Sequence, residues 1–313
     1  MCAELKGLEF LIQLKSKGQI ESLTTIICFD TDISEEIKES AKRSELRILD
    51  FWEIIKAGET CQDLRLIRPQ PETIYMFCYT SGTTGDPKGV MLSHRSFICL
   101  VHATIWFKVD LNEEDIHISY LPYGHTFEQC FFVFSLFKGI ASGFYSGDPL
   151  KLMDDMKALK PTIFVTVPRI LTRVYGKVQE SLQHKGSFTK WLFNRAISSK
   201  AYNYDAYGCL NHPIYDRFVL RSVKDIFGGH VRFMVSASAP ISAEVLAFFK
   251  VALGIHIYES YGQTETNGPA TLTHPLDHSH GTVGGVVPSM RIRLRDLPEL
   301  GYMSTDNPPR GEV

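Results

Sequence analysis

The sequence predicts an α/β protein with parallel or mixed sheets covered by helices. Three observations lead to this class. Short apolar runs with the character of buried strands alternate with segments of helical periodicity, and this alternation is typical of largely parallel sheets covered on both faces. The composition, 44% hydrophobic and 22% charged residues, is that of a globular protein. The 313 residues are enough for about two domains or one large one.

The first elements are placed by strand patterns and helix caps. Residues 24–29 form an apolar run that predicts a buried strand. Asp50 is an N-cap residue for a short helix that stops at Gly58. Residues 74–79 predict a second strand, and a glycine-rich loop follows it directly.

The middle of the chain continues the alternation. Helix resumes near Ser93, and Thr126 with Gln129 has the spacing of a capping box at the start of another helix. Residues 161–168 predict a further strand. After it, residues 169–230 have a mostly helical pattern with many aromatic side chains and mixed charge.

The last part places one helix between two strands. Residues 231–236 predict a strand that ends in small side chains, and residues 255–260 predict another. Between them, Ser242 caps a helix that ends at Gly254. Its apolar side chains at helical spacing form a buried stripe: Val245, Phe248, Phe249 and Ala252.

Three loops rich in polar and small residues follow Tyr79, Ser236 and Tyr258. Ligands of open α/β sheets bind outside the carboxyl ends of the strands. We expect all three loops to leave their strands at that end and to share one site.

The first of these loops has the composition of a polyphosphate-binding site. It reads Thr80-Ser81-Gly82-Thr83-Thr84-Gly85-Asp86-Pro87-Lys88-Gly89. Glycines let backbone N–H groups approach an anion, hydroxyls donate further hydrogen bonds, and the lysine adds a positive charge. It is not a Walker A loop, because Asp-Pro separates Gly85 from Lys88. A flexible turn is the alternative for the composition alone, but the ordered string resembles the signature loop of the acyl-adenylate-forming enzymes.

A second segment, Tyr258-Glu259-Ser260-Tyr261-Gly262-Gln263-Thr264-Glu265, resembles the YGxTE motif of the same superfamily. Gly262 permits a tight backbone path, and Tyr261 offers a flat face for a purine. Thr264 can form a hydrogen bond with a phosphate, and Glu265 is a hard oxygen ligand suited to Mg²⁺. A polar loop with a solvated glutamate is the alternative.

Two further segments are similar to parts of this superfamily. In the first, Ser236-Ala237-Ser238-Ala239-Pro240, the resemblance implies that adenine lies against small side chains, while Pro240 also suits the start of a helix. The second, residues 121–128, resembles the segment that borders the carboxylate-substrate pocket. This resemblance implies that Tyr123, His125 and Phe127 contact the substrate. For the histidine, a purely structural role is the alternative.

Residues 167–178, the helical stretch to about residue 230 and residues 301–313 narrow the resemblance to long-chain fatty acyl-CoA synthetases. The resemblance implies ATP-dependent adenylation of a fatty acid with Mg²⁺, followed by transfer to coenzyme A with release of AMP and pyrophosphate. It implies catalytic roles for Lys88, Thr264 and Glu265, and Mg²⁺ binding by Glu265 and Thr80. The nucleotide-binding residues that it implies are Thr80, Ser81, Gly82, Thr83, Thr84, Gly85, Lys88, Ala237, Ser238, Ala239, Glu259, Ser260, Tyr261, Gly262, Gln263 and Thr264.

The resemblance also divides the chain into four parts. They are a partial α/β subdomain (1–70), a phosphate-loop and substrate-gate region (71–168), a helical insertion (169–230) and an adenine- and Mg²⁺-binding region (231–313). The family's ribose-binding aspartate, hinge and C-terminal lid domain with its lysine would follow residue 313, and family members carry a longer N-terminal stretch. We therefore expect the isolated chain to bind ATP weakly and to turn over little, because a lid excludes water.

Other functions and sites are disfavoured. A formal net charge of −2 without basic runs gives no reason to expect a nucleic acid partner. Seven scattered cysteines argue for a reducing compartment, and His274, His278 and His280 lack the spacing of a zinc site. The most apolar stretch, residues 130–144, is too short to span a bilayer. We expect an intracellular protein, cytosolic or peripheral on the endoplasmic reticulum or peroxisomal membrane.

Two alternatives from outside this branch stay open. The chain could be an adenylating ligase for another carboxylic acid, or a non-catalytic nucleotide- or acyl-binding remnant. A P-loop NTPase is the weakest alternative, because the Lys-Ser/Thr pair is absent from the loop.

Overall fold

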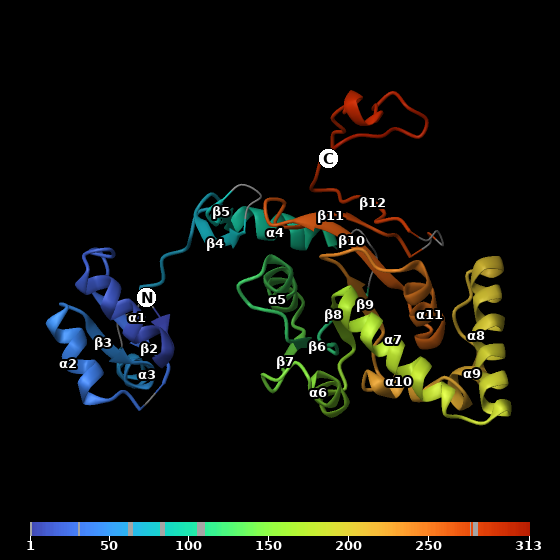
Figure 1. Cartoon of the computed structure of the whole chain (residues 1–313), viewed down its shortest axis with the longest axis horizontal. Coiled ribbons are helices and arrows are strands. Elements are labelled where there is room, and N and C mark those ends of the chain that lie inside the picture. Colours follow the sequence, from blue (N-terminus) through green and yellow to red (C-terminus); the bar gives the residue numbers. More distant parts are fainter. Residues whose placement is uncertain are drawn as a thin grey trace. The chain divides into compact units, whose positions relative to one another are not determined.

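The computed structural model describes residues 2–30, 32–61, 65–81, 85–104, 110–275, 277 and 281–313, and Figure 1 labels its elements. The chain forms two compact units, Met1–Arg68 and Pro69–Val313. Each contains a sheet with helices packed against it, so the predicted α/β class with parallel and mixed sheets is confirmed.

The first unit is built on a three-stranded parallel sheet with the order β1-β2-β3. Asp50 caps its last helix as predicted, because its carboxylate accepts the backbone N–H groups of Trp52 at 2.7 Å and Glu53 at 3.1 Å. The elements are β1 (Cys2–Ala3), α1 (Leu5–Ser16), β2 (Thr25–Cys28), α2 (Glu35–Arg43), β3 (Arg47–Asp50) and α3 (Phe51–Glu59).

The second unit contains a seven-stranded mixed sheet with the order β12-β11-β10-β9-β8-β6-β7. The pairs from β7 to β10 are parallel, and β11 and β12 add antiparallel strands at one edge. The strands are β6 (Ile116–Ser119), β7 (Ala141–Phe144), β8 (Ile163–Thr166), β9 (Phe233–Ser236), β10 (Ile257–Gln263), β11 (Gly268–Leu272) and β12 (Gly285–Val286).

Helices cover both faces of this sheet (Figure 1). Alternate side chains of one strand face opposite sides. Ile163 and Val165 pack in a cluster with Phe127 and Phe134 of α5, whereas Phe164 packs with residues of α7, α8, α10 and α11. The helices are α4 (His94–Thr104), α5 (Thr126–Lys138), α6 (Leu152–Leu159), α7 (Pro168–Gln183), α8 (Ser187–Tyr207), α9 (Pro213–Phe218), α10 (Arg221–Ile226) and α11 (Ala243–Leu253), and a 3₁₀ turn covers Pro298–Leu300.

One predicted strand belongs to a different sheet. Residues 74–79 were expected to join the parallel sheet, but β4 (Ile74–Thr80) pairs antiparallel with β5 (Lys88–Ser93) in a separate two-stranded sheet. The prediction was wrong because parallel strands need a long crossover connection, while the glycine-rich loop is long enough only for a hairpin. The sequence reading also missed β5, which starts inside the presumed loop.

Residues 169–230 are mostly helical, as predicted, and they form α7 to α10. The buried Lys200 ammonium pairs with the Asp216 carboxylate, which ties α8 to α9. Burial lowers the pKa of Lys200, although the contact with Asp216 acts in the opposite direction. Gly254 ends α11 in a left-handed conformation with φ of +68°, as predicted. Ser242 occupies the N-cap position of α11, but its side chain makes no capping hydrogen bond within the described part of the chain.

Within the described ranges, none of the helices combines the length and the apolar character that crossing a membrane requires.

Candidate active site

A polar cavity lies where three distant segments of the chain meet, beyond the carboxyl ends of β9 and β10. Its volume is about 180 Å³. The residues that follow Ser236 and Tyr258 both border it, but those after Tyr258 form no loop at first, because β10 continues to Gln263. Its lining residues come from the start of α5, the loop after β9 and the stretch from β10 to β11: His125, Thr126, Phe127, Ala237, Ser238, Ser260, Gly262, Gln263, Thr264, Gly268 and Pro269.

The strand register brings the last two of these segments to one level. Thr166, Ser236 and Glu259 are paired across β8, β9 and β10. Beyond the strand, the N–H of Ala237 donates to the carbonyl oxygen of Thr166 at 3.3 Å, so the chain stays attached to the sheet. Ser238 then takes a φ of +75°, a strained conformation for a residue with a side chain and one that clusters at binding sites.

Gly262 is required by the close approach of two backbones. β10 and β11 pair antiparallel with a bulge between Tyr261 and Gly262. A Cβ atom on Gly262 would lie 1.9 Å from the carbonyl oxygen of Gly268, a separation that no side chain tolerates. The glycine of the motif therefore lets the chain carry Gln263 and Thr264 to the edge of the cavity.

A tight turn follows and separates the next two residues of the motif. The N–H of Gln263 donates to the hydroxyl oxygen of Thr266 at 2.9 Å, and the N–H of Asn267 donates to the carbonyl oxygen of Thr264 at 3.0 Å. Thr264 stays half-buried beside the cavity, and Glu265 is exposed. In the described part of the chain the Glu265 carboxylate has no hydrogen-bond or ion-pair partner, so it is available to a cation.

His125 caps α5, which corrects the predicted capping box. Its Nδ1 accepts the N–H of Phe127 at 3.1 Å, so Thr126 is the first helical residue and not the cap. The Gln129 N–H, which the threonine hydroxyl was expected to bind, donates to the carbonyl oxygen of His125 at 3.1 Å. Gln129 donates instead to the carbonyl oxygen of Tyr123 at 2.7 Å. In a neutral His125 ring the hydrogen is then on Nε2.

The predicted phosphate loop connects the two strands of the hairpin. Thr80, the last residue of β4, is paired with Lys88, the first residue of β5, so both leave the same end of the hairpin. Ser81 and Lys88 are exposed, and Gly85 has a φ of +137°, which favours glycine. The three central residues of the loop lie outside the described residues: Gly82, Thr83 and Thr84.

Side-chain contacts hold the hairpin against the start of α5. The Cys78 thiol donates to the carbonyl oxygen of Gly124 at 3.3 Å, and the Tyr75 hydroxyl donates to Oε1 of Gln129 at 2.8 Å. Thr80 is two residues beyond Cys78, about 7 Å along an extended strand. The phosphate loop therefore begins near the end of α5 that borders the cavity.

The same helix supports the turn that carries Glu265. The Cys130 thiol on α5 donates to the carbonyl oxygen of Asn267 at 3.1 Å, and burial raises the pKa of this thiol. Cys130 also belongs to the apolar cluster that holds Cys78 of the hairpin. The hairpin and the turn thus share one support, and the buried thiols act as small core groups.

Several predicted residues do not line the cavity. Glu259 and Tyr261 alternate with Ser260 along β10, so their side chains face the other side of the strand. Burial raises the pKa of Glu259, although the charge of Lys250 acts in the opposite direction. The Tyr261 hydroxyl accepts a hydrogen bond from the side-chain amide of Gln263 at 2.9 Å. The other predicted residues that the structure describes away from the cavity wall are Thr80, Ser81, Gly85, Lys88, Tyr123, Ala239 and Glu265. Their roles stay predictions.

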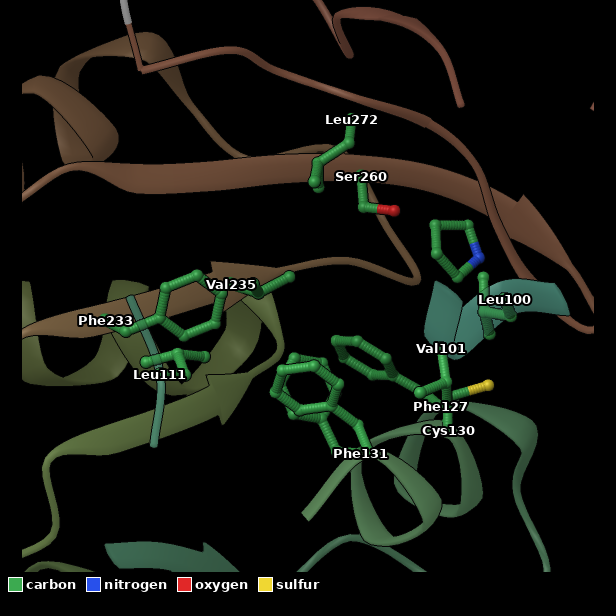
Figure 2. Close-up of a pocket in the computed structure, with 12 residues that line it drawn as sticks. Leu100, Val101, Leu111, Phe127, Cys130, Phe131, Phe233, Val235, Ser260 and Leu272 are labelled. Carbon is green, nitrogen blue, oxygen red and sulfur yellow. The ribbon is translucent and has the colours of Figure 1, made fainter. Parts of the chain in front are cut away.

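A second cavity, which is apolar, adjoins the polar one and shares Phe127, Ser260 and Pro269 with it. Its volume is about 60 Å³. Figure 2 shows Phe127 and Phe131 of α5 on one side of it and Ser260 and Leu272 on the opposite side. The sequence reading missed its other lining residues, because they come from separate elements: Leu100, Val101, Leu111, Cys130, Phe131, Phe134, Phe233, Val235 and Leu272.

Glu128 is a second feature that the sequence reading missed. It lies in the first turn of α5, is fully buried, and its Oε1 accepts the Ser119 hydroxyl at 2.5 Å. Its Oε2 has no hydrogen-bond partner among the described residues. Burial raises the pKa of Glu128 to about 7, although the hydrogen bonds from Ser119 and from the backbone of Leu121 act in the opposite direction. A glutamate in a first helical turn normally stabilises the helix end from an exposed position. The sequence pattern therefore did not predict that this carboxyl group is buried.

Metal-binding side chains are sparse in this region. Among the residues that the structure describes, no three His, Cys, Asp or Glu side chains are grouped so that they could hold a metal ion. His274 is exposed, and His278 and His280 lie outside the described residues. Glu265 and Thr80 offer oxygen donors, and Mg²⁺ commonly takes only one or two carboxylates together with substrate phosphates. The donor set therefore fits Mg²⁺ brought by a nucleotide better than a resident metal.

Comparisons with known proteins agree with the motifs. The chain matches the model of the AMP-binding enzyme family over residues 3–313. It is 38% identical to long chain acyl-CoA synthetase 6, peroxisomal, of Arabidopsis thaliana, over 89% of this chain and 40% of that protein. It is 36% identical to long-chain-fatty-acid–CoA ligase 5 of Mus musculus, over 100% of this chain and 45% of that protein. The chain thus spans less than half of the length of these relatives.

A solved structure supports the fold. The adenylation domain of a carboxylate reductase from Mycobacterium chelonae has a TM-score of 0.73 and 22% identity, covering 99% of this chain and 45% of that one. At this identity the likeness concerns the fold alone, and it confirms the large-domain type that the sequence predicted. With the family match extending over nearly every residue, the chain belongs to the AMP-binding enzyme family.

Proposed function

We propose that this protein is the nucleotide-binding part of an ATP-dependent long-chain fatty acid–CoA ligase. One observation carries the proposal. Three segments chosen from the sequence for different tasks border one cavity: His125 and Phe127 at the substrate side, Ala237 and Ser238 for adenine, and Thr264 for phosphate. Chance placement of three such distant segments around the same cavity is a poor explanation for this arrangement.

The polar cavity suits the AMP part of the nucleotide. Ala237 and Ser238 present small side chains that leave space for a base. Thr264 contributes a hydroxyl that can bind the α-phosphate. Tyr261 lies on the other face of β10, so base stacking on its ring requires the adenine to sit at the strand edge.

The hairpin loop suits the β- and γ-phosphates. Its hydroxyls, glycine N–H groups and the Lys88 ammonium would neutralise and orient them. Glu265 and Thr80 would hold Mg²⁺, which offsets negative charge on the phosphates when it is bound. Both ligand groups extend from elements packed on α5, which keeps them in a fixed relation to the cavity.

The apolar cavity suits the start of an alkyl chain. Phe127 stands between the two cavities and can hold the carboxylate end of a fatty acid toward the α-phosphate. A carboxylate oxygen then bonds to the α-phosphorus while the bond to pyrophosphate breaks. In the second step the sulfur of coenzyme A bonds to the acyl carbon, the bond to AMP breaks, and the thiol proton is released.

The location follows from the substrate. The thiols in the described part of the chain are free, in line with an intracellular, reducing compartment. Long-chain fatty acids partition into membranes, so a cytosolic enzyme or one held at the surface of the endoplasmic reticulum or peroxisome would meet its substrate there. Peripheral membrane contact belongs to this proposal.

Calorimetric titration of the chain with MgATP and with AMP tests the nucleotide assignment. We expect Lys88→Ala to weaken MgATP binding about ten-fold, because a charge-assisted hydrogen bond is worth about 1.5–3 kcal/mol, and to leave AMP binding unchanged. Glu265→Gln should weaken ATP only when Mg²⁺ is present. Lys151→Ala, at the exposed N-cap lysine of α6, is the control. Equal losses for ATP and AMP would exclude the proposed phosphate contacts.

Adenylate analogues separate the ligase from its alternatives. Non-hydrolysable palmitoyl and benzoyl adenylates should differ, with the palmitoyl compound the tighter ligand, because each buried methylene contributes about 0.8 kcal/mol. Tighter binding of the benzoyl compound would indicate a ligase for aryl acids. Binding without any thioester formation would indicate a non-catalytic binding module.

A further inference from the structure

The helical insertion carries a charge that the rest of the chain does not. Between Arg169 and His230 there are ten lysines and arginines and four aspartates and glutamates, a formal net charge of +6, while the whole chain is at −2. The compensating negative charge therefore lies elsewhere. A local field of this sign attracts anionic surfaces.

Large aromatic side chains protrude from the same insertion. Phe188 and Trp191, one turn apart at the start of α8, are 72% and 60% exposed, and their rings stack with centroids 6.0 Å apart. Phe218 at the end of α9 is 72% exposed, and the Arg217 guanidinium carbon lies 5.5 Å from its ring centroid. Rings of this size are normally well buried, so three exposed ones within the insertion indicate a surface with a use.

A cavity of about 340 Å³ lies between α7, α8, α9 and α10, and Phe218 is among its lining residues, whereas Phe188 and Trp191 are not. Val178, Phe193 and Val223 form part of an apolar floor, and Lys177 and Lys185 stand at its rim. Both lysines are exposed, and the described part of the chain places no carboxylate within ion-pair distance of either. An apolar hollow edged by unpaired ammonium groups is suited to an amphiphile with a negative head.

We propose that this surface, defined by Lys177, Lys185, Phe188, Trp191 and Phe218, binds the anionic phospholipids of a membrane. The lysines would contact lipid phosphates, and the rings would enter the interfacial layer, where aromatic side chains with a polar neighbour are favoured.

The topology leaves the candidate site free in this arrangement. α7 starts where β8 ends and must run back along the sheet, because the chain re-enters it in the parallel strand β9. Its 16 residues carry the chain about 24 Å from the carboxyl ends of the strands. Lys177, Lys185 and Phe188 therefore lie toward the opposite end of the sheet. The inference adds a lipid class and a surface to the proposed membrane contact, and it does not depend on ligase activity.

Vesicle co-sedimentation of the full 313-residue chain, without nucleotide or fatty acid, tests it. We expect binding to phosphatidylcholine vesicles that contain phosphatidylserine, little binding to phosphatidylcholine alone, and a loss of binding at high salt. The double variant Lys177→Glu/Lys185→Glu should bind at least about ten-fold more weakly. The control Lys6→Glu/Lys17→Glu makes the same charge change at exposed lysines of the first unit and should bind like the unchanged chain.

A second pair of variants separates the rings from the charges. Phe188→Ala/Trp191→Ala should weaken binding, whereas Tyr202→Ala/Tyr207→Ala, at exposed rings on the other half of α8, should not. Trp191 fluorescence should shift to the blue on addition of anionic vesicles, and Trp191→Phe should lack that shift. Equal binding to neutral vesicles, unchanged binding of both surface variants, or capture of polyglutamate but not vesicles would overturn the proposal. MgATP affinity of the same variants should be unchanged, so failure here and failure of the ligase proposal are distinguishable.

Discussion

The two adjoining cavities differ in chemistry although they share three residues. The polar cavity is bordered by loops and strand ends, with hydroxyls and backbone groups from Ser238 to Thr264. The apolar cavity is bordered almost wholly by side chains of α4, α5 and neighbouring strands. The shared residue Phe127 is the first-turn aromatic of α5, and its N–H binds the His125 cap. The difference teaches that one helix start can divide a polar cavity from an apolar one.

The largest effect is predicted for a substitution that disrupts the polar cavity, and it tests whether the shape of this cavity depends on one glycine. Gly262→Ala places a methyl group against the carbonyl of Gly268, so we expect a loss of about 3 kcal/mol in the free energy of unfolding and at least ten-fold weaker MgATP binding. Urea unfolding and calorimetry would measure both. Gly58→Ala in α3, where nothing lies within 4 Å of the new atom, is the matched control and should not destabilise. Normal nucleotide binding by Gly262→Ala would show that the bulge does not shape the site.

The next prediction concerns the helix that both cavities share. Burial raises the pKa of Glu128 in the folded protein to about 7, above its ordinary value of 4.5. Between pH 4.5 and 7 the folded protein therefore keeps this proton, and the unfolded chain releases it. The free energy of unfolding should therefore fall by about 2 kcal/mol as the pH rises from 4.5 to 7 and change little from this group outside that window. Glu128→Gln should remove this part of the dependence, measured by urea unfolding across the pH range.

Glu180→Gln, at an exposed glutamate of α7, serves as its control and should keep the dependence. If Glu128→Gln has the same pH profile as the unchanged chain, the buried carboxyl is not protonated in the folded protein.

Sequence reasoning located the polar cavity and not the apolar one, and the reason is physical. Gly262, Thr264 and the small residues after Ser236 act through backbone geometry and local hydrogen bonds, which short motifs encode. The apolar wall depends on which faces of α4 and α5 meet β9 and β11, and apolar spacing alone does not decide this. The hairpin was missed for a related reason: Lys88 and Gly89 look like loop residues, yet they start β5.

Other local signals had mixed outcomes. Asp50 and Gly254 act as cap and stop because each has one strong backbone preference. The cap of α5 was assigned to Thr126 because hydroxyls are the common caps, and the imidazole of His125 was not considered. The burial of Glu128 requires Ser119 from a strand nine residues earlier, a tertiary contact that no helix pattern reports.

A smaller change should separate the two cavities by ligand. Leu272→Phe adds volume to the apolar wall, so we expect about ten-fold weaker binding of a palmitoyl adenylate analogue, the equivalent of roughly two methylenes, with AMP affinity unchanged. Leu136→Phe makes the same exchange at an exposed position of α5 and should have no effect. Equal losses for both ligands would mean that the cavities do not act as separate subsites.

The smallest predicted effect separates the two roles of His125. His125→Ala removes the cap and should cost about 1 kcal/mol of stability, whereas His125→Asn retains a capping acceptor and should cost little. If the histidine also contacts the substrate, the asparagine variant will fold normally and still bind the palmitoyl analogue more weakly. Thermal unfolding and calorimetry on the same two variants would show which role holds.

Hydrogen–deuterium exchange with and without MgATP tests the central claim most directly, because it reports where the nucleotide binds along the whole chain. We expect slower exchange in three separate stretches, residues 80–89, 236–239 and 260–266, with little change in residues 169–230. Protection confined to the helical insertion or to the first unit, with these three stretches unchanged, would contradict the proposed nucleotide site.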